Sequence, residues 1–206
     1  MLSYGDWRTR IGALRCRYLG VTDVRRWADA STYDDWEERT RIIAELIPAG
    51  ARVIEFGAGN PLLERHLPQG STYVPSDIVD RGAGTVVVDL NRRPLPELGR
   101  EFDVAVLAGV LEYVQSVPCL LSWLSQWVPT VIASYSCPTS RTHGPRRLLE
   151  RFRRAGAGWV NSYSEVELVE IAARARFHLE QAITWHTADG DERIFKFSRK
   201  QADLDP

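Results

Sequence analysis

A glycine-rich turn follows an acidic residue near the end of a predicted buried strand. Residues 53–60 run from apolar side chains into Glu55 and then into Gly57 and Gly59. Glycine has no Cβ, so a ligand can approach such a turn closely, and a following helix offers free N–H groups there. The pattern indicates a cradle for a nucleotide-like cofactor. A tight turn between a strand and a helix, with no ligand, would have the same pattern.

Two further acidic residues extend this pattern, because each ends a later predicted strand. Asp77 ends the second strand, where a carboxylate accepts hydrogen bonds from both hydroxyls of a ribose in dinucleotide-binding folds. Asp89 ends the third strand, where it could accept a hydrogen bond from the exocyclic amine of an adenine. The three acids therefore predict a cofactor that contains adenosine.

The surrounding elements alternate in the order that would bring these residues to one edge of a sheet. Apolar runs predict strands at 52–56, 72–77, 85–89, 102–110, 130–135, 179–187 and 192–197. Helical patterns predict one helix that starts after Ser31 or Thr32, and three more over 62–67, 118–127 and 164–176. This order is typical of an α/β fold with a doubly wound, Rossmann-like, mostly parallel seven-stranded sheet. The Asp189-Gly190 pair predicts a C-terminal antiparallel hairpin, and residues 1–30 predict extra N-terminal helices.

With these motifs in this order, the sequence resembles the class I S-adenosylmethionine-dependent methyltransferases. In that family the glycine turn holds the methionine part of the cofactor, the second acid holds the ribose, and the third lies at the adenine. The segment 107–114 also resembles the family's fourth strand and the turn that follows it. The resemblance implies S-adenosyl-L-methionine as cofactor and S-adenosyl-L-homocysteine as product. The implied cofactor-binding residues are Glu55, Gly57, Gly59, Asp77, Asp89, Leu90 and Ala108.

The sequence departs from the family pattern at two positions. Pro61 replaces the third glycine and removes one N–H from the cradle. Tyr113 stands where small-molecule methyltransferases often carry histidine. A nicotinamide dehydrogenase is the rival interpretation of the turn, but its G-x-G-x-x-G fingerprint would need a glycine at Leu62. The resemblance further implies a methyltransferase domain over 31–200 with an acceptor-side insertion at 137–161, an N-terminal helical cap over 1–30, and a tail at 201–206.

Composition excludes several other classes of protein. The chain has 206 residues, a net charge of −1 and 44% hydrophobic residues, which suits one globular domain and argues against broad nucleic-acid binding. The apolar run 104–111 is too short to span a membrane, and the first residues lack the apolar core of a signal peptide. Three widely spaced cysteines fit a reducing compartment and show no metal-ligand spacing. We therefore expect a cytoplasmic protein without integral membrane association. All but two of its basic residues are arginine, which is typical of a GC-rich bacterium.

Candidate residues for the methyl acceptor follow from the expected carboxyl edge of the sheet. A hydroxyl acceptor must lose a proton, and histidine is the usual base. His143 is the best of the four histidines, because it lies in the loop that begins just after the fifth strand, although an exposed loop histidine would look the same. The candidate acceptor-contacting residues are Tyr33, Trp36, Glu112, Tyr113, Tyr135 and Arg141.

These features predict O-methylation of a hydroxyl on a small polar acceptor, such as a sugar or glycoside. N- or C-methylation of another metabolite is one alternative. A methyltransferase-like binding module without catalysis is another. Neither a metal site nor a nucleic-acid partner is expected, and exposed apolar residues on the N-terminal helices could support a homodimer.

Overall fold

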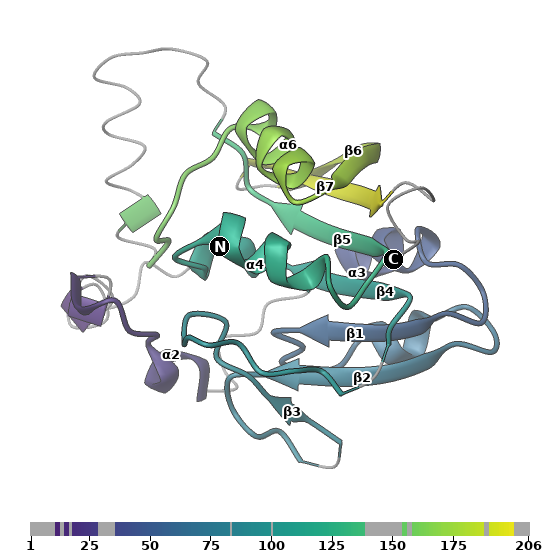
Figure 1. The fold of residues 1–206 in the computed structure, drawn as a ribbon, viewed down its shortest axis with the longest axis horizontal. Coiled ribbons are helices and arrows are strands. Elements are labelled where there is room, and N and C mark those ends of the chain that lie inside the picture. The colour runs from purple at the N-terminus through teal and green to yellow at the C-terminus, as the bar shows by residue number, and fades with distance from the viewer. Residues whose placement is uncertain are drawn as a thin grey trace.

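The computed structural model of the chain is a single sheet covered by helices on both faces (Figure 1). The part of the chain that it describes comprises residues 11–12, 15–16, 18–28, 36–82, 84–99, 101–138, 154–155, 158–187 and 190–199.

The sheet has seven strands in the order β3-β2-β1-β4-β5-β7-β6. The strands are β1 (Arg52–Phe56), β2 (Thr72–Asp77), β3 (Val86–Val87), β4 (Val104–Ala108), β5 (Thr130–Tyr135), β6 (Phe177–Thr187) and β7 (Gly190–Arg199). The first five are parallel, whereas β7 runs antiparallel to both β5 and β6. The predicted fold class, including the C-terminal hairpin, is therefore confirmed.

Two apolar layers hold the helices against the sheet. On one face, Leu107 packs with residues of α4 (Val117–Leu124) and α6 (Glu165–Arg174). On the other face, Val53 and Val106 pack with α3 (Glu37–Glu45) and with the short helix η2 (Leu63–His66). Side chains of a strand alternate between faces, which is why β1 and β4 supply apolar residues to both layers. Figure 1 shows α4 and α6 in front of the sheet and α3 behind it.

The fourth strand is shorter than predicted, and the difference shapes the site. Gly109 adopts φ +67°, so the chain leaves the sheet after Ala108 and turns into the short helix η3 (Leu111–Tyr113). A strand cannot continue through this left-handed conformation, which glycine adopts at little cost. The turn brings Glu112 back against the end of β5, where its side chain accepts a hydrogen bond from the Ser136 N–H.

The described N-terminal residues lie at the carboxyl edge of the parallel strands. Helix α2 (Val24–Ala28) lies beyond the arrowheads of β1 and β2 in Figure 1. The Arg81 guanidinium donates to the carbonyl of Trp27 and so ties this helix to the loop after β2. Helix α3 begins at Glu37, later than a cap at Ser31 or Thr32 would place it, and Trp36 at its N-cap makes no side-chain capping bond. No described helix is long and apolar enough to cross a membrane.

Candidate cofactor and acceptor site

The glycine turn after β1 depends on the left-handed conformation of two residues. Gly57 has φ +68° and Gly59 has φ +53°, and the Ala58 N–H between them donates to the Ser76 carbonyl at 3.0 Å. A Cβ placed on Gly57 would lie 2.6 Å from Cγ2 of Val110. The chain itself therefore requires glycine here, in addition to any close approach by a ligand. The contact also shows that the turns after β1 and β4 meet.

Asp77 is a buried carboxylate that holds this turn. Its Oδ2 accepts a hydrogen bond from the Gly59 N–H at 2.8 Å, and its Oδ1 accepts one from the Val79 N–H at 3.1 Å. Nε of Arg81 lies 3.5 Å from Oδ2. A carboxylate offers about four lone-pair sites, so these contacts leave capacity for a further donor. The geometry fits the predicted hydrogen bond to a ribose hydroxyl.

Asp89 connects the N-terminal segment to the sheet. Its Oδ1 accepts hydrogen bonds from the Thr22 hydroxyl at 2.8 Å and from the Asn91 N–H at 2.9 Å. The Asn91 amide then donates to the Tyr113 carbonyl at 2.9 Å, and its Oδ1 accepts from the Gln115 N–H at 2.8 Å. Asn91 thus joins the loop after β3 to the loop after η3, a role that the sequence analysis did not assign. The predicted contact of Asp89 with adenine stays a prediction.

Two apolar residues on the predicted cofactor list lie at the same edge. Leu90 is buried in the core layer of α4 and α6, and Ala108 is the last residue of β4. Ala108 packs against the layer under α3, so the two residues lie on opposite faces of the sheet.

Glu55 is a buried acid on the face of the sheet that α3 covers. Its carboxyl group accepts a hydrogen bond from the Tyr73 hydroxyl on the neighbouring strand β2. Burial raises the pKa of Glu55 to about 7, although the Tyr73 hydrogen bond and the nearby Arg39 act in the opposite direction. Desolvation disfavours the charged form of an acid, so Glu55 is partly protonated near neutral pH.

Arg39 of α3 is a buried cation beside Glu55, and its side chain is only 4% exposed. Its guanidinium carbon lies 4.7 Å from the ring centroid of Trp36 and 5.8 Å from that of Trp185. A Cβ on Gly109 would be 2.9 Å from Nη1 of Arg39, so the guanidinium lies against the turn after β4. Arg39 was not among the residues predicted from the sequence, because a polar residue in an amphipathic helix usually faces water.

Glu192 is the residue that forms an ion pair with Arg39. Its Oε2 lies 3.4 Å from Nη1 of Arg39. In β7, Glu192 directly precedes Arg193, which pairs with Tyr135 at the end of β5. The antiparallel return of β7 beside β5 brings this residue back to the carboxyl edge.

Glu112 and Trp36, both expected at the acceptor, also lie near this cation. Glu112 is 3% exposed, and its Oε2 has no hydrogen-bond partner within the described ranges. Burial and the negative charge of Glu192 raise the pKa of Glu112 to about 7, against the Ser136 N–H and Arg39. The edge thus gathers three acids around one arginine.

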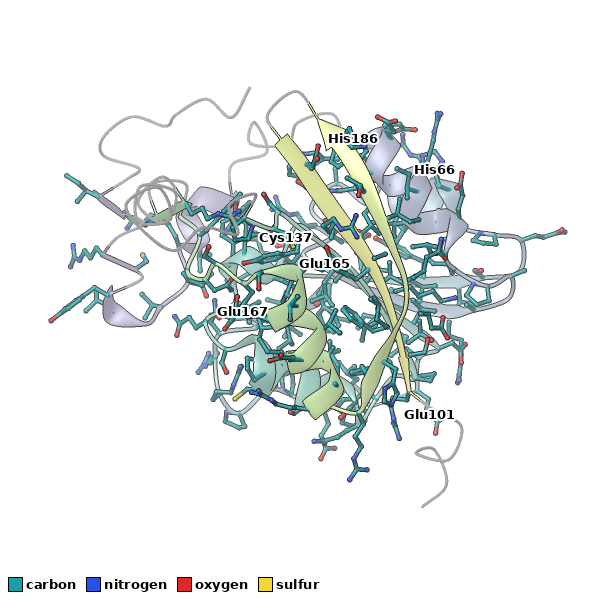
Figure 2. The ribbon with its side chains drawn as sticks, turned by 90° about the horizontal axis from the view of Figure 1, so that it is seen from above. His66, Glu101, Cys137, Glu165, Glu167 and His186 are labelled. Atoms are coloured by element: carbon teal, nitrogen blue, oxygen red, sulfur yellow. The ribbon has the colours of Figure 1, made fainter. Side chains whose placement is uncertain are left out.

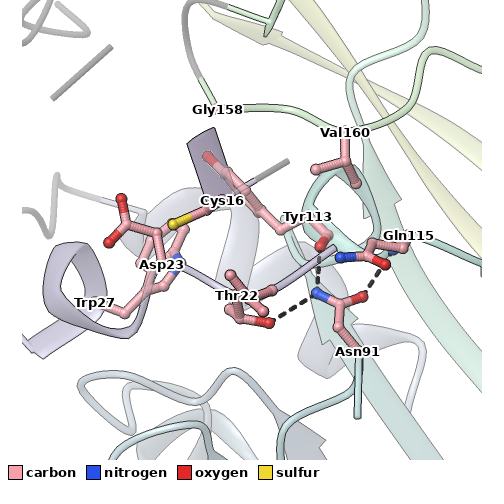
Figure 3. A pocket seen from close by; sticks show the side chains of 10 residues that line it. Cys16, Thr22, Asp23, Trp27, Asn91, Tyr113, Gln115, Gly158 and Val160 are labelled. Atoms are coloured by element: carbon pink, nitrogen blue, oxygen red, sulfur yellow. Dashed lines mark hydrogen bonds between the residues drawn. The ribbon is translucent and has the colours of Figure 1, made fainter. Parts of the chain in front are cut away.

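A pocket lies between the N-terminal segment and the loops after β3 and η3 (Figure 3). The ring of Trp27 meets that of Tyr113 edge-on, with centroids 4.7 Å apart. The Trp159 indole N–H donates to the Tyr113 hydroxyl at 3.1 Å. The lining residues are Cys16, Val21, Thr22, Asp23, Trp27, Asn91, Tyr113, Gln115, Gly158 and Val160. The pocket therefore combines an aromatic wall with carboxylate, amide and hydroxyl groups.

Tyr135, also expected at the acceptor, has a different setting. It is 0% exposed, its hydroxyl donates to Oδ1 of Asn161 at 2.7 Å, and it accepts from the Tyr163 N–H at 2.8 Å. These bonds hold the segment 161–163 against the end of β5. Burial raises the pKa of Tyr135 above its usual range, which makes its hydroxyl a poor acid.

Three expected acceptor-side residues, His143, Tyr33 and Arg141, lie outside the described residues. His66 and His186, labelled in Figure 2, are engaged elsewhere: His66 Nε2 lies 2.8 Å from a Glu37 oxygen, and His186 Nδ1 lies 2.9 Å from Oδ1 of Asp191. Within the part of the chain that the structure describes, no group of three His, Cys, Asp or Glu residues could hold a metal ion.

Comparisons with known proteins agree with this geometry. Residues 27–182 match a family model described as a methyltransferase domain. A comparison with curated proteins gives no match.

Among solved structures, the chain is similar to the 1,6-didemethyltoxoflavin-N1-methyltransferase of Burkholderia thailandensis, solved with S-adenosylhomocysteine. The identity is 16% and the TM-score 0.63, over 96% of this chain and 92% of that one. It is also similar to the magnesium protoporphyrin IX methyltransferase of Synechocystis, with 17% identity and a TM-score of 0.56 over 80% and 83% of the two chains. A third similar structure is an S-adenosylmethionine-dependent methyltransferase of Mesorhizobium loti, with 17% identity and a TM-score of 0.57 over 77% and 96%. At these identities the likeness concerns the fold.

The setting of Asp77 leads to a binding prediction. Asp77→Ala should weaken binding of S-adenosylhomocysteine at least about tenfold, because hydrogen bonds to a charged acceptor contribute roughly 1.5–3 kcal/mol each. Isothermal titration calorimetry measures this affinity. Asp80→Ala, in the same loop and bonded to the Gly82 N–H, is the control and should bind normally. Asp77→Asn keeps the volume of the side chain; native affinity in both Asp77 variants would contradict the ribose contact.

The buried carboxyl of Glu112 leads to a prediction on stability. Its folded-state pKa of about 7 exceeds the value of about 4.3 expected in an unfolded chain. Between these values the folded state retains a proton that the unfolded state releases, so the free energy of unfolding falls as pH rises from about 5 to 7. Glu112→Gln should remove roughly 1–3 kcal/mol of this fall. Urea unfolding at both pH values measures it, and parallel pH dependence in the two proteins would contradict the assignment.

Proposed function

The chain belongs to the class I S-adenosylmethionine-dependent methyltransferase family, and we propose that it methylates a hydroxyl of a small polar acceptor such as a sugar or glycoside. S-adenosylmethionine is the cofactor, and it supplies a methyl group already activated by the sulfonium. With such a donor, the main tasks of the protein are to bring the two reactants together in line and to keep water away.

The chain's own residues divide these tasks along the carboxyl edge. Asp77 and the turn through Gly57 and Gly59 would hold the ribose and the methionine end of the cofactor. Asp89 and Leu90 would border the adenine. All of them lie at the ends of parallel strands, where ligands bind in open α/β sheets.

The observation that carries the acceptor class is the pocket that Trp27 and Tyr113 help to line. Aromatic faces pack on the C–H surfaces of a sugar ring, while amide and carboxylate side chains such as those of Gln115 and Asp23 accept or donate to its hydroxyls. The pocket lies where the N-terminal cap and the segment 158–160, part of the expected acceptor-side insertion, come together. These features support a small polar acceptor.

An amine is the second candidate acceptor, and Asp23 is the observation that favours it. A carboxylate in the wall of a partly apolar pocket stabilises a cation, so it would also suit N-methylation. A non-catalytic binding module is a third reading, and turnover with any acceptor would exclude it.

An acceptor screen with a pocket variant tests the proposal. Pools of hydroxyl and amine acceptors are incubated with the enzyme and methyl-labelled cofactor, and labelled products are identified by mass. Trp27→Leu should lower kcat/KM for the accepted compound roughly three- to tenfold, since aromatic contacts contribute about 0.5–1.5 kcal/mol beyond area burial. Trp123→Leu is the matched control, because Trp123 packs on Phe56 away from the pocket. Equal effects of the two substitutions, or labelling of amines alone, would contradict O-methylation in this pocket.

His143 is the proposed base for the acceptor hydroxyl. It follows β5 in the sequence, and the loop after this strand starts at the carboxyl edge. A general base contributes about 10²–10⁴-fold to turnover, so His143→Ala should lower kcat by that order while leaving affinity for S-adenosylhomocysteine unchanged. The rate of the native enzyme should rise with pH through one ionisation near neutrality, and the variant should lose this rise. Near-native turnover in His143→Ala would leave proximity alone as the mechanism.

A further inference from the structure

Arg39 is a buried cation whose described contacts leave most of its donors unused. A guanidinium carries five N–H donors. The described contact of these donors is the ion pair with Glu192 at 3.4 Å, and Nε has no hydrogen-bond partner within the described residues. Removing a charge from water is costly unless hydrogen bonds replace the lost hydration. The unused N–H donors of Arg39 can therefore bind an anionic group.

The position of Arg39 indicates which anion it would bind. Its guanidinium lies against the turn at Gly109, and the next residue, Val110, is in contact with the glycine turn at Gly57. The cation thus lies at the junction of the two turns, on the side that carries Glu55. A cofactor whose ribose is bound at Asp77 and whose methionine end follows the glycine turn would bring its amino-acid group toward this junction. That group carries one carboxylate and one ammonium.

We propose that Arg39 binds the α-carboxylate of S-adenosylmethionine, with Trp36 and Trp185 holding the plane of the guanidinium. This inference rests on the cofactor assignment above and assigns the residue that recognises the charged end of the cofactor. Arg39 is suited to this task because its rigid fork can donate two parallel hydrogen bonds to a carboxylate. Glu192 occupies one donor of the cation and competes with the ligand.

The surrounding acids are compatible with a bound carboxylate. Glu55 and Glu112 both face Arg39, and burial raises the pKa of each to about 7. Near neutral pH these two groups are therefore partly protonated, which limits their repulsion of an incoming anion. In their ionised form either could attract the ammonium of the same amino-acid group.

A cycle of two ligands and two proteins isolates the carboxylate. The ligands are S-adenosylhomocysteine and its decarboxylated amine analogue, which differ only in that group. Arg39→Met preserves much of the apolar stem between the tryptophans and removes the charge. Calorimetry should show that this substitution weakens S-adenosylhomocysteine roughly ten- to a hundredfold, as expected for a charge-assisted pair. Affinity for the amine analogue should change less than about threefold.

Arg41→Met is the matched control, because Arg41 lies on the same helix, is 64% exposed and pairs with Glu37. It should leave both affinities unchanged. An equal loss for both ligands in Arg39→Met, or no loss for either, would overturn the proposal. If Arg39→Met does not fold, Arg39→Lys keeps the charge but loses the fork, and it should still weaken S-adenosylhomocysteine selectively. Failure of the native protein to bind either ligand would overturn the cofactor assignment itself, a different result from loss of selectivity.

Discussion

The buried carboxylate of Asp77 is the contact on which the cofactor edge depends. It ends β2, yet it accepts the N–H of Gly59 from the turn after β1, so it fixes the relative position of two strand ends. The same glycine turn contacts Val110 after β4, and this contact links a third strand end to the other two. A buried anion without such donors would be strongly destabilising. The same interaction therefore stabilises the turn and prepares the acid to bind a ligand.

The electrostatics of the edge follow from placing several acids around one arginine. Glu55, Glu112 and Glu192 come from β1, η3 and β7, and Arg39 comes from α3 on the covering face. Full ionisation of all three acids would leave excess negative charge in a poorly hydrated place, and the raised pKa values of Glu55 and Glu112 reduce that charge. Because two of its acids can be protonated or ionised near neutral pH, the cluster suits a site that must accept a ligand carrying both a positive and a negative group.

The sequence predicts the strands and the acidic residues at their ends because both depend on local pattern. Val53, Ile54 and Phe56 form an apolar run before Gly57, and the structure contains strand β1 at this run. The cluster around Arg39 could not be predicted in this way. Arg39 and Glu192 are separated by most of the chain, and only the packing of α3 on the sheet and the return of β7 beside β5 bring them together.

The two sides of the edge also differ in the kind of element that forms them. On the cofactor side, glycine turns and carboxylates are fixed by parallel strands, whose ends can move little without breaking the ladder between β1, β2 and β4. On the acceptor side, the wall comes from Cys16, residues 21–23, Trp27 and residues 158–160. Described contacts join this wall to Asp89, Asn91 and Tyr113. A strand end is constrained by its neighbours, whereas a loop or a terminal segment can vary in length and sequence with less effect on the core. The cofactor side is therefore expected to set the chemistry shared across the family, and the cap and insertion to set which acceptor this enzyme takes.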